Sequence, residues 1–184
     1  MGKTRCIGRI LFGILLGSLI VGATIIGAAQ AIDWARVLKE TMPNTDKFTQ
    51  LSDLNKYKAR ELTRAIFPAY KDGNQVGVVF YAAPYGYQSN LHTLTALDMK
   101  GTVVKVNVFS HNETPSYVVP LDNGSYLRQF EGVTLLDRLS FLIGARPTKR
   151  GEIQSIVDAT ATAKPIALAV SEARKLFVEI YGAR

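Results

Sequence analysis

The sequence predicts an α+β protein, in which an N-terminal transmembrane helix is followed by an antiparallel sheet with packed helices. Three observations lead to this fold class. Residues 10–32 form an uncharged apolar run, the centre of the chain holds β-favouring runs separated by turn residues, and the C-terminal segment repeats apolar residues at helical spacing. The chain is therefore expected to divide into a membrane anchor, residues 1–32, and a globular domain, residues 33–184.

The apolar run at residues 10–32 exceeds the roughly 20 residues that cross a bilayer as a helix. Lys3, Arg5 and Arg9 precede it, and basic residues mark the cytoplasmic flank of a span. We therefore expect a single-pass protein of the cell membrane whose soluble domain lies on the exoplasmic side. A cleaved signal peptide is the alternative, because Ala29-Gln30-Ala31 resembles a cleavage site. Both interpretations deliver the domain to the same compartment.

Composition argues against several functional classes. The only cysteine is Cys6, so no intramolecular disulfide can form, and the two histidines have no cysteine nearby to complete a structural zinc site. No metal is expected. The net charge of +7 falls to +4 without the three cations ahead of the apolar run, and the rest is spread without a basic block, so no nucleic-acid partner is expected. No nucleophile–base pair or nucleotide-binding glycine loop stands out, so no catalytic residues are assigned.

The centre of the chain predicts an antiparallel meander. Turn residues separate runs rich in Val, Thr, Phe and Tyr, as in successive hairpins. The segment 51–71 before them is mixed, with room for a short helix ahead of an extended stretch at residues 67–70. The strands are expected at residues 75–83, 91–97 and 103–109.

Helices are expected on both sides of the meander. Residues 34–39 continue from the apolar run as a helical exit stalk, and residues 121–142 have helical periodicity in two pieces. The last helix is expected to begin near Pro165, because proline is tolerated in the first turn of a helix. Its buried stripe comprises Ile166, Val170, Ala173, Phe177 and Ile180.

Two groups of polar residues are candidates for a site. Thr160 and Thr162 stand just before the last predicted helix, where hydroxyls and unpaired N–H groups converge and can hold a phosphate. His111, Glu113 and Thr114 follow the end of the third strand, and loops at such positions often carry sites.

These residues resemble a known family. Gly86-Tyr87, His111-x-Glu113-Thr114-Pro115 and Ala159-Thr160-x-Thr162 occur in an order that is similar to the FMN-binding domain. This domain occurs in the G subunit of Rnf-type ferredoxin:NAD oxidoreductases and in the C subunit of sodium-translocating NADH:quinone reductases. The resemblance runs from about Met42 to the C-terminus. It implies FMN attached through a phosphoester to a threonine, a flavin transferase that attaches it, and partner subunits in a redox complex at the lipid bilayer.

The family motif, Ser-Gly-Ala-Thr-x-Thr/Ser, aligns its flavin-bearing threonine with Thr160, its second hydroxyl with Thr162 and a frequent lysine with Lys164. Val157-Asp158 replaces Ser-Gly, so the conformational freedom of glycine is lost. A carboxylate beside a phosphodiester is also unfavourable unless Lys164 or the basic loop at residues 144–151 offsets it. A second register takes Asp158 as the acid of the transferase motif and makes Thr162 the attachment point. We favour Thr160.

The resemblance implies further cofactor contacts. Tyr85 and Tyr87 are expected to flank the isoalloxazine, while Glu113, Thr114 and Lys164 are expected to hydrogen-bond its polar edge or the ribityl chain. Each residue has a simpler alternative: the threonines are helix caps, Glu113 binds backbone amides, and His111 stabilises its loop. The complete expected set is Tyr85, Gly86, Tyr87, His111, Glu113, Thr114, Asp158, Ala159, Thr160, Thr162 and Lys164.

The sequence thus predicts a membrane-anchored electron-transfer subunit that carries covalent FMN, rather than a stand-alone enzyme. Two alternatives remain open. The chain is a non-covalent ligand-binding or sensory module on the same fold, or it is a redox-inactive structural subunit of a membrane complex.

Overall fold

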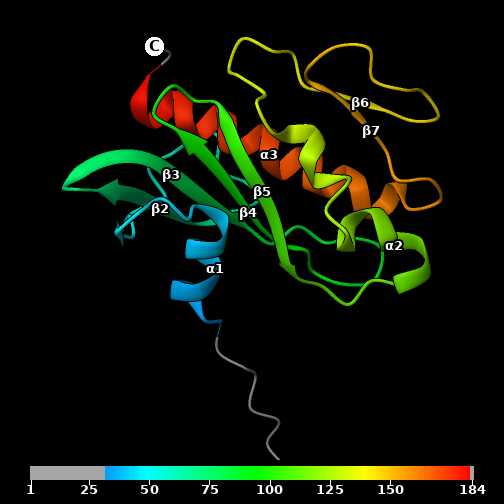
Figure 1. Cartoon of the computed structure of the whole chain (residues 1–184), viewed down its shortest axis with the longest axis horizontal. Coiled ribbons are helices and arrows are strands. Elements are labelled where there is room, and N and C mark those ends of the chain that lie inside the picture. Colours follow the sequence, from blue (N-terminus) through cyan, green and yellow to red (C-terminus); the bar gives the residue numbers. More distant parts are fainter. Residues whose placement is uncertain (1–31, 183–184) are drawn as a thin grey trace, which may run out of the picture. The chain divides into compact units, whose positions relative to one another are not determined.

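A five-stranded antiparallel sheet forms the centre of the computed structural model, which describes residues 32–182 (Figure 1). The strands lie in the order β1-β2-β3-β4-β5, so each pairs with its neighbour in sequence, and the predicted meander is confirmed. The strands are β1 (Lys47–Phe48), β2 (Thr63–Lys71), β3 (Asn74–Ala82), β4 (His92–Asp98) and β5 (Val103–Ser110). The other elements are α1 (Trp34–Thr41), α2 (Pro115–Asp122), the 3-10 helix η1 (Leu127–Phe130), α3 (Thr160–Tyr181) and a parallel pair, β6 (Ser140–Leu142) and β7 (Glu152–Gln154).

The two long hairpins close at the predicted turns. Asp72 and Gly73 have positive φ between β2 and β3, a conformation that Gly and Asp accept more readily than most residues. Between β4 and β5, the Asp98 carboxylate accepts hydrogen bonds from the N–H groups of Lys100 and Thr102, at 2.8 and 2.9 Å. Local turn chemistry therefore fixes the register of the sheet.

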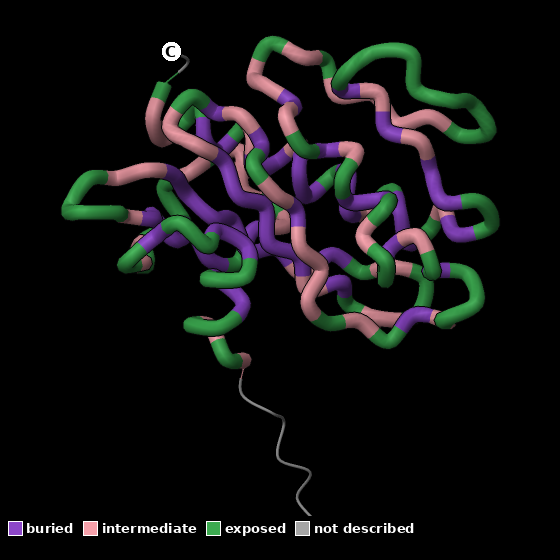
Figure 2. Tube along the Cα trace, in the orientation of Figure 1, coloured by how far each residue is buried: buried purple, intermediate pink, exposed green. Residues whose placement is uncertain are grey.

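The main core lies between the sheet and α3. Side chains of β2, β3, β4 and β5 pack there against Ala163, Ile166, Val170, Ala173 and Phe177 of the helix. Figure 2 shows that the buried residues concentrate along the central strands and α3. Ile166, Val170, Ala173 and Phe177 are fully buried and Ile180 is half-buried, which confirms the predicted stripe.

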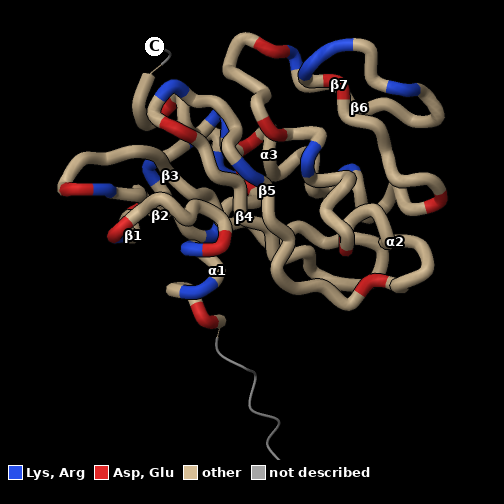
Figure 3. The backbone as a smooth tube through the Cα atoms, in the orientation of Figure 1, with Lys and Arg blue, Asp and Glu red and all other residues tan. Residues whose placement is uncertain are grey.

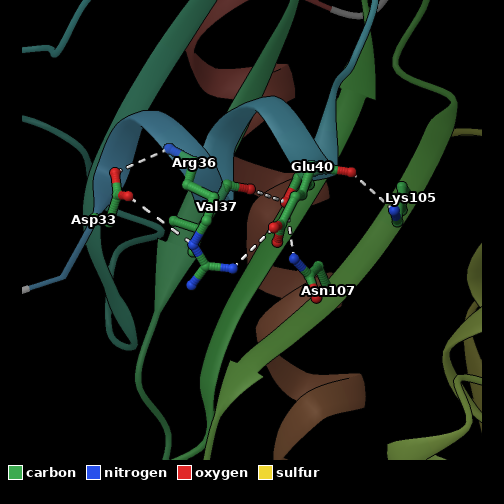
Figure 4. Close-up of polar contacts among 7 residues, drawn as sticks. Asp33, Arg36, Val37, Glu40, Lys105 and Asn107 are labelled. Atoms are coloured by element: carbon green, nitrogen blue, oxygen red, sulfur yellow. Dashed lines mark hydrogen bonds and ion pairs between the residues drawn. The ribbon is translucent and has the colours of Figure 1, made fainter.

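The opposite face of the sheet is covered by α1. Its Trp34 ring lies 4.8 Å from Tyr81 and 6.2 Å from Phe109, measured between ring centroids. At the other end of α1, Lys105 Nζ donates to the carbonyl of Glu40 and the Asn107 side-chain amide donates to the Thr41 hydroxyl, at 2.8 and 3.2 Å (Figure 4). The predicted stalk is therefore a helix fixed to the sheet.

The last helix begins earlier than predicted. α3 starts at Thr160, so both threonines lie in its first turn and Pro165 lies inside the helix. Pro165 removes one backbone hydrogen bond, to the carbonyl of Ala161, but this position is within two turns of the N-terminus. Burial of Thr162, Ala163 and Ile166 stabilises the helix across the proline.

Two helix predictions are wrong. The segment 121–142 is interrupted where the sequence interrupts its periodicity, at Gly124 and Gly132, both with positive φ, but it contains only the end of α2, η1 and the short β6 where two helical pieces were expected. The segment 51–62 contains no helix. Its N–H groups are bound instead by carboxylates of α3: Glu172 accepts from residues 61–63 and Glu179 from residues 58 and 59.

The predicted transmembrane helix, residues 10–32, lies outside the described residues apart from Ile32. None of the helices between residues 32 and 182 combines the length and apolar character that a membrane span requires.

Candidate functional site

Glu113 organises the polar end of the molecule. Its carboxylate accepts the backbone N–H groups of Tyr87, Gln88 and Ser89 at 2.9–3.1 Å, and the Ser89 hydroxyl at 2.8 Å. The three N–H groups converge because residues 86–89 form a tight turn, in which Gly86 N–H donates to the Ser89 carbonyl at 2.7 Å. A Cβ on Gly86 would lie 2.9 Å from the carboxylate, so only glycine fits against it without a shift.

The same carboxylate also holds the first turn of α3. The Thr162 hydroxyl donates to Glu113 Oε2 at 2.5 Å, and both residues are more than nine-tenths buried. Burial by itself raises the pKa of a carboxyl group, but the hydrogen bonds from Thr162, Ser89 and the amides of Gln88 and Tyr87 outweigh it and lower the Glu113 pKa to about 2. Glu113 is therefore an anion at neutral pH that joins two loops to a helix.

Thr160 and Asp158 lie on the exposed side of this turn. The half-buried Thr160 hydroxyl is 3.1 Å from the hydroxyl of Ser155. Asp158 has φ of +59°, the left-handed conformation that glycine adopts most readily. The aspartate thus adopts the backbone conformation expected of the glycine that it replaces in the motif.

A cavity of about 410 Å³ opens at this turn. The loop 84–91 and α2 each contribute a tyrosine, Tyr87 and Tyr117, and the start of α3 contributes Ala161 and Thr162. The full lining is Tyr87, Glu113, Thr114, Tyr117, Val118, Asp158, Ala159, Ala161 and Thr162. Six of the predicted site residues thus line one cavity: Tyr87, Glu113, Thr114, Asp158, Ala159 and Thr162.

A second, wider cavity of about 890 Å³ adjoins the first, and the two share Tyr117 and Asp158. Ser155 and Pro147 also line it. Thr160 itself lines neither cavity but lies between them: its neighbours Ala159 and Ala161 face the first, and its hydrogen-bond partner Ser155 faces the second.

Four other predicted residues lie around the first cavity without lining it. Tyr85 is 63% exposed, Gly86 lies behind Glu113, and His111 Nε2 donates a hydrogen bond to the Asp122 carboxylate at 2.9 Å. His111 also accepts the N–H of Glu113 on its other ring nitrogen, so it shapes the loop. Lys164 lies in a separate groove beside β6.

The charge around the two cavities is uneven (Figure 3). Among the described residues, the first cavity is lined by two carboxylates, Glu113 and Asp158, and by no lysine or arginine. Basic residues gather instead in the loop between β6 and β7, where Pro147 reaches the second cavity. Arg146 of this loop forms no salt bridge with any described residue. Within residues 32–182, the second cavity is itself lined by Asp158 and by no lysine or arginine, so a bound anion would depend on the loop around Pro147 for its countercharge.

Sequence reasoning did not find Ser89, Tyr117 or Ser155. Ser89 and Ser155 act through hydrogen bonds to Glu113 and Thr160, and neither serine stands in a local pattern that signals such a bond. Tyr117 follows Pro115, whose place at the start of α2 is a recognised helix-start signal. That signal could have placed Tyr117 on a helix at the site.

Comparison with known proteins agrees with this geometry. Residues 86–175, which contain the turn at Gly86, Glu113 and both threonines, match the profile of the FMN-binding domain. Almost half of the chain is therefore similar to the FMN-binding domain family. The FMN-binding domain thus includes every residue that lines the first cavity.

Curated relatives extend the similarity beyond the FMN-binding domain. The G subunit of the Na⁺-translocating ferredoxin:NAD⁺ oxidoreductase complex of Acetobacterium woodii is 25% identical over 143 residues, which cover 77% of this chain. The G subunit of an ion-translocating oxidoreductase complex of Cereibacter sphaeroides is 30% identical over 105 residues, or 56% of this chain. The matched regions span only 66% and 47% of these two relatives.

Among solved structures, NqrC of Shewanella oneidensis has a similar fold. The two superpose with a TM-score of 0.53 over 84% of this chain and 79% of NqrC, at 18% sequence identity. The antiparallel sheet with packed helices is therefore a fold that this chain shares with NqrC, as the sequence predicted.

Proposed function

We propose that this protein is a membrane-anchored electron-transfer subunit that carries FMN on Thr160 through a phosphoester bond. The observation that carries the proposal is the cavity at the first turn of α3, which is built entirely from the FMN-binding domain and is lined by Ala159 and Ala161 on either side of Thr160. When bound, FMN supplies the capacity to accept and release electrons. The protein supplies the position of the ring and excludes water from part of it.

The residues present fit a flavin. The cavity volume lies within the range of about 300–1,000 Å³ that small-molecule sites occupy. Tyr87 and Tyr117 offer aromatic surface for the ring, and the N–H groups in the first turn of α3 favour an anion at Thr160. The carboxylate of Asp158 opposes this anion, and since Lys164 lies in a separate groove, the countercharge would have to come from the basic loop at residues 144–151.

The environments of the two threonines favour Thr160 as the attachment residue. Thr162 is 2% exposed and its hydroxyl is bonded to the Glu113 carboxylate, so a phosphate there would lie against a buried negative charge. Thr160 is half-buried and bonded only to another hydroxyl. The glycine-like conformation of Asp158 also supports the register that places Thr160 at the family threonine.

The partners follow from the relatives, which are named as subunits of ion-translocating oxidoreductase complexes. We place this chain in such a complex, with its domain on the exoplasmic side and residues 10–32 in the bilayer. A flavin transferase would attach the FMN, with the Thr160 oxygen bonding to the flavin phosphate and the rest of the nucleotide donor leaving.

Mass spectrometry of the full chain, produced together with a flavin transferase, tests the attachment. The wild-type mass should exceed that of the chain by one FMN less one water, and the yellow colour should survive denaturation. Thr160→Val should abolish this increment, whereas Thr160→Ser keeps the hydroxyl and should retain it. An unmodified wild-type chain, or a modified Thr160→Val chain, would contradict the proposal. Flavin that dissociates on denaturation would instead favour the non-covalent alternative.

A further inference from the structure

We infer that the end of the sheet that carries the flavin cavity is a membrane-contacting surface, which meets the headgroup region of a zwitterionic bilayer. This inference rests on the anchor of the proposed function but not on the flavin. The surface consists of Trp34, Tyr85, Tyr87, Tyr117 and Val119, and is called the aromatic end below.

The chain enters the domain at this end. Asp33, which caps α1, directly follows the apolar run in the sequence, and α1 runs antiparallel to β5. The last turn of α1 meets β5 at Lys105 and Asn107 (Figure 4). Trp34, in the first turn, meets Phe109, next to the end of the strand. The start of α1 is therefore fixed at the end of β5.

The cavity lies at the same end of the sheet. Ser110, the last residue of β5, pairs with His92, the first residue of β4. Beyond this pair the two chains stay joined, because Asn112 N–H donates to the Ser89 hydroxyl at 2.9 Å and Glu113 binds the turn at residues 87–89. In Figure 1 the first turn of α1, the end of β5 and α2 all lie along the lower side of the domain.

The exposed side chains at this end are those that a membrane interface favours. Tyr85, Tyr87 and Tyr117 are 63%, 71% and 54% exposed, and Val119 is also 54% exposed. Tyrosine and tryptophan combine an apolar ring with a polar atom, which suits the boundary between headgroups and acyl chains.

The distribution of basic residues near the aromatic end indicates which lipid headgroups it would contact. Residues 72–99 and 106–127, which supply the ends of β3, β4 and β5, the loop 84–91 and α2, contain no lysine or arginine. The cations nearest this end, Arg36 of α1 and Arg64 at the start of β2, are not clustered. The contact would therefore depend on apolar and aromatic insertion and not on attraction to anionic lipids, which requires clustered basic residues. A zwitterionic phosphatidylcholine surface fits this composition, and the interaction should be insensitive to salt.

The experiment uses full-length chain without flavin in phosphatidylcholine vesicles. Trp34 is the only tryptophan, so Trp34→Phe provides a background in which a single new tryptophan reports its own surroundings. Tyr85→Trp and Val119→Trp place reporters on the aromatic end at residues that do not line the first cavity. Leu136→Trp is the control: it is 97% exposed, and its neighbour Leu135 packs on Gly101 in the turn at the other end of β4 and β5.

Lipids brominated on their acyl chains quench tryptophan that lies near the headgroup boundary, whereas acrylamide quenches tryptophan in water. An interfacial side chain penetrates about 5–10 Å, so both reporters on the aromatic end should lose roughly half of their fluorescence to bromolipid, at low and at high salt. The Leu136→Trp reporter should respond to acrylamide alone.

Three results would overturn the inference. Chains that sediment with vesicles but show no bromolipid quenching at positions 85 and 119 would exclude the contact while leaving the anchor intact. Protection from acrylamide only in the presence of other subunits would assign the aromatic end to a protein partner. Failure to sediment with vesicles would remove the anchor and this inference together, although the mass test of Thr160 would still decide the flavin.

Discussion

The two halves of α3 meet their surroundings in opposite ways. Its N-terminal end is bound by a carboxylate from another segment of the chain. Glu113 binds the turn at residues 87–89 and also accepts a hydrogen bond from Thr162 of the helix. In its C-terminal half the carboxylates come from the helix, where Glu172 and Glu179 bind the N–H groups of residues 58–63.

Both arrangements fix an irregular segment by giving its N–H groups an ionised acceptor, which binds them more strongly than a neutral group. The two arrangements differ in how much of the helix surface they leave accessible. Glu172 and Glu179 cover their part of α3 with chain, whereas Glu113 binds Thr162 and leaves Asp158, Ala159 and Ala161 facing a cavity. A carboxylate that reaches the helix from another segment of the chain therefore holds the helix in place and still leaves space beside it for a ligand.

Glu113→Gln should have the largest effect. An amide has one acceptor oxygen and brings an NH₂ group against the N–H donors, so several buried donors lose their partner. We expect a loss of about 2–4 kcal/mol in the free energy of unfolding and loss of flavin incorporation. Urea denaturation at neutral pH and mass spectrometry measure the two effects. An unchanged stability would show that the carboxylate does not hold this end of the molecule.

The pH dependence of the unfolding free energy tests whether the ionised Glu113 carboxylate causes this loss of stability. The Glu113 pKa is about 2 in the folded protein and near 4.5 as the ordinary value of the group, so its stabilisation is fully present above pH 4.5 and disappears as the pH falls through 2. At about 1.4 kcal/mol per pH unit this amounts to roughly 3 kcal/mol. The difference in unfolding free energy between wild type and Glu113→Gln should therefore shrink towards pH 2. A difference independent of pH would contradict the ionised state.

Glu172→Gln tests the other half of α3. Glu172 accepts four hydrogen bonds from the N–H groups of Glu61, Leu62 and Thr63, so its replacement should reduce the free energy of unfolding by about 1–3 kcal/mol. Because Glu172 does not line the cavity, covalent flavin incorporation should stay at the wild-type level in protein that is still folded. Incorporation that falls in parallel with Glu113→Gln would mean that the two halves of the helix do not act separately.

Asp158→Gly should have the smallest effect, and of opposite sign. Glycine relieves the cost of a left-handed residue but loses more conformational entropy on folding, so we expect the unfolding free energy to rise by no more than about 1 kcal/mol. Removal of the carboxylate beside Thr160 should also speed flavin attachment. Asp158→Asn separates the two causes, because it removes the charge and keeps a side chain that tolerates positive φ. Slower attachment in both variants would contradict an opposing charge at Asp158.

The parts of the fold that could be predicted are those encoded by local pattern. The meander follows from turn residues such as Asp72-Gly73 and from β-favouring runs, and the buried stripe of α3 follows from its spacing. The start of α3 could not be placed, because threonine is a poor helix former and Pro165 is typical of a first helical turn. Burial of Thr162 against Glu113 overrides both preferences.

Sequence motifs were enough to select candidate site residues, but they did not indicate which residues these side chains contact. Thr160 and Glu113 could be selected because they stand in recognisable patterns, yet nothing local indicates that Glu113 binds a turn 24–26 residues earlier and a helix 49 residues later. The pairing of Ser155 with Thr160 also depends on how the chain leaves β7. Such contacts are set by the tertiary fold.

Pro165 has one further consequence. Since it has no N–H, the carbonyl of Ala161 lacks its helical partner, and the first turn of α3 is joined to the rest of the helix by one hydrogen bond fewer than an unbroken helix would provide. The turn that bears Thr160 therefore opens at a lower free energy than the buried helix beyond it. If Thr160 carries the flavin as proposed, access of a flavin transferase to its hydroxyl would be governed by this local equilibrium, and the core would not need to unfold.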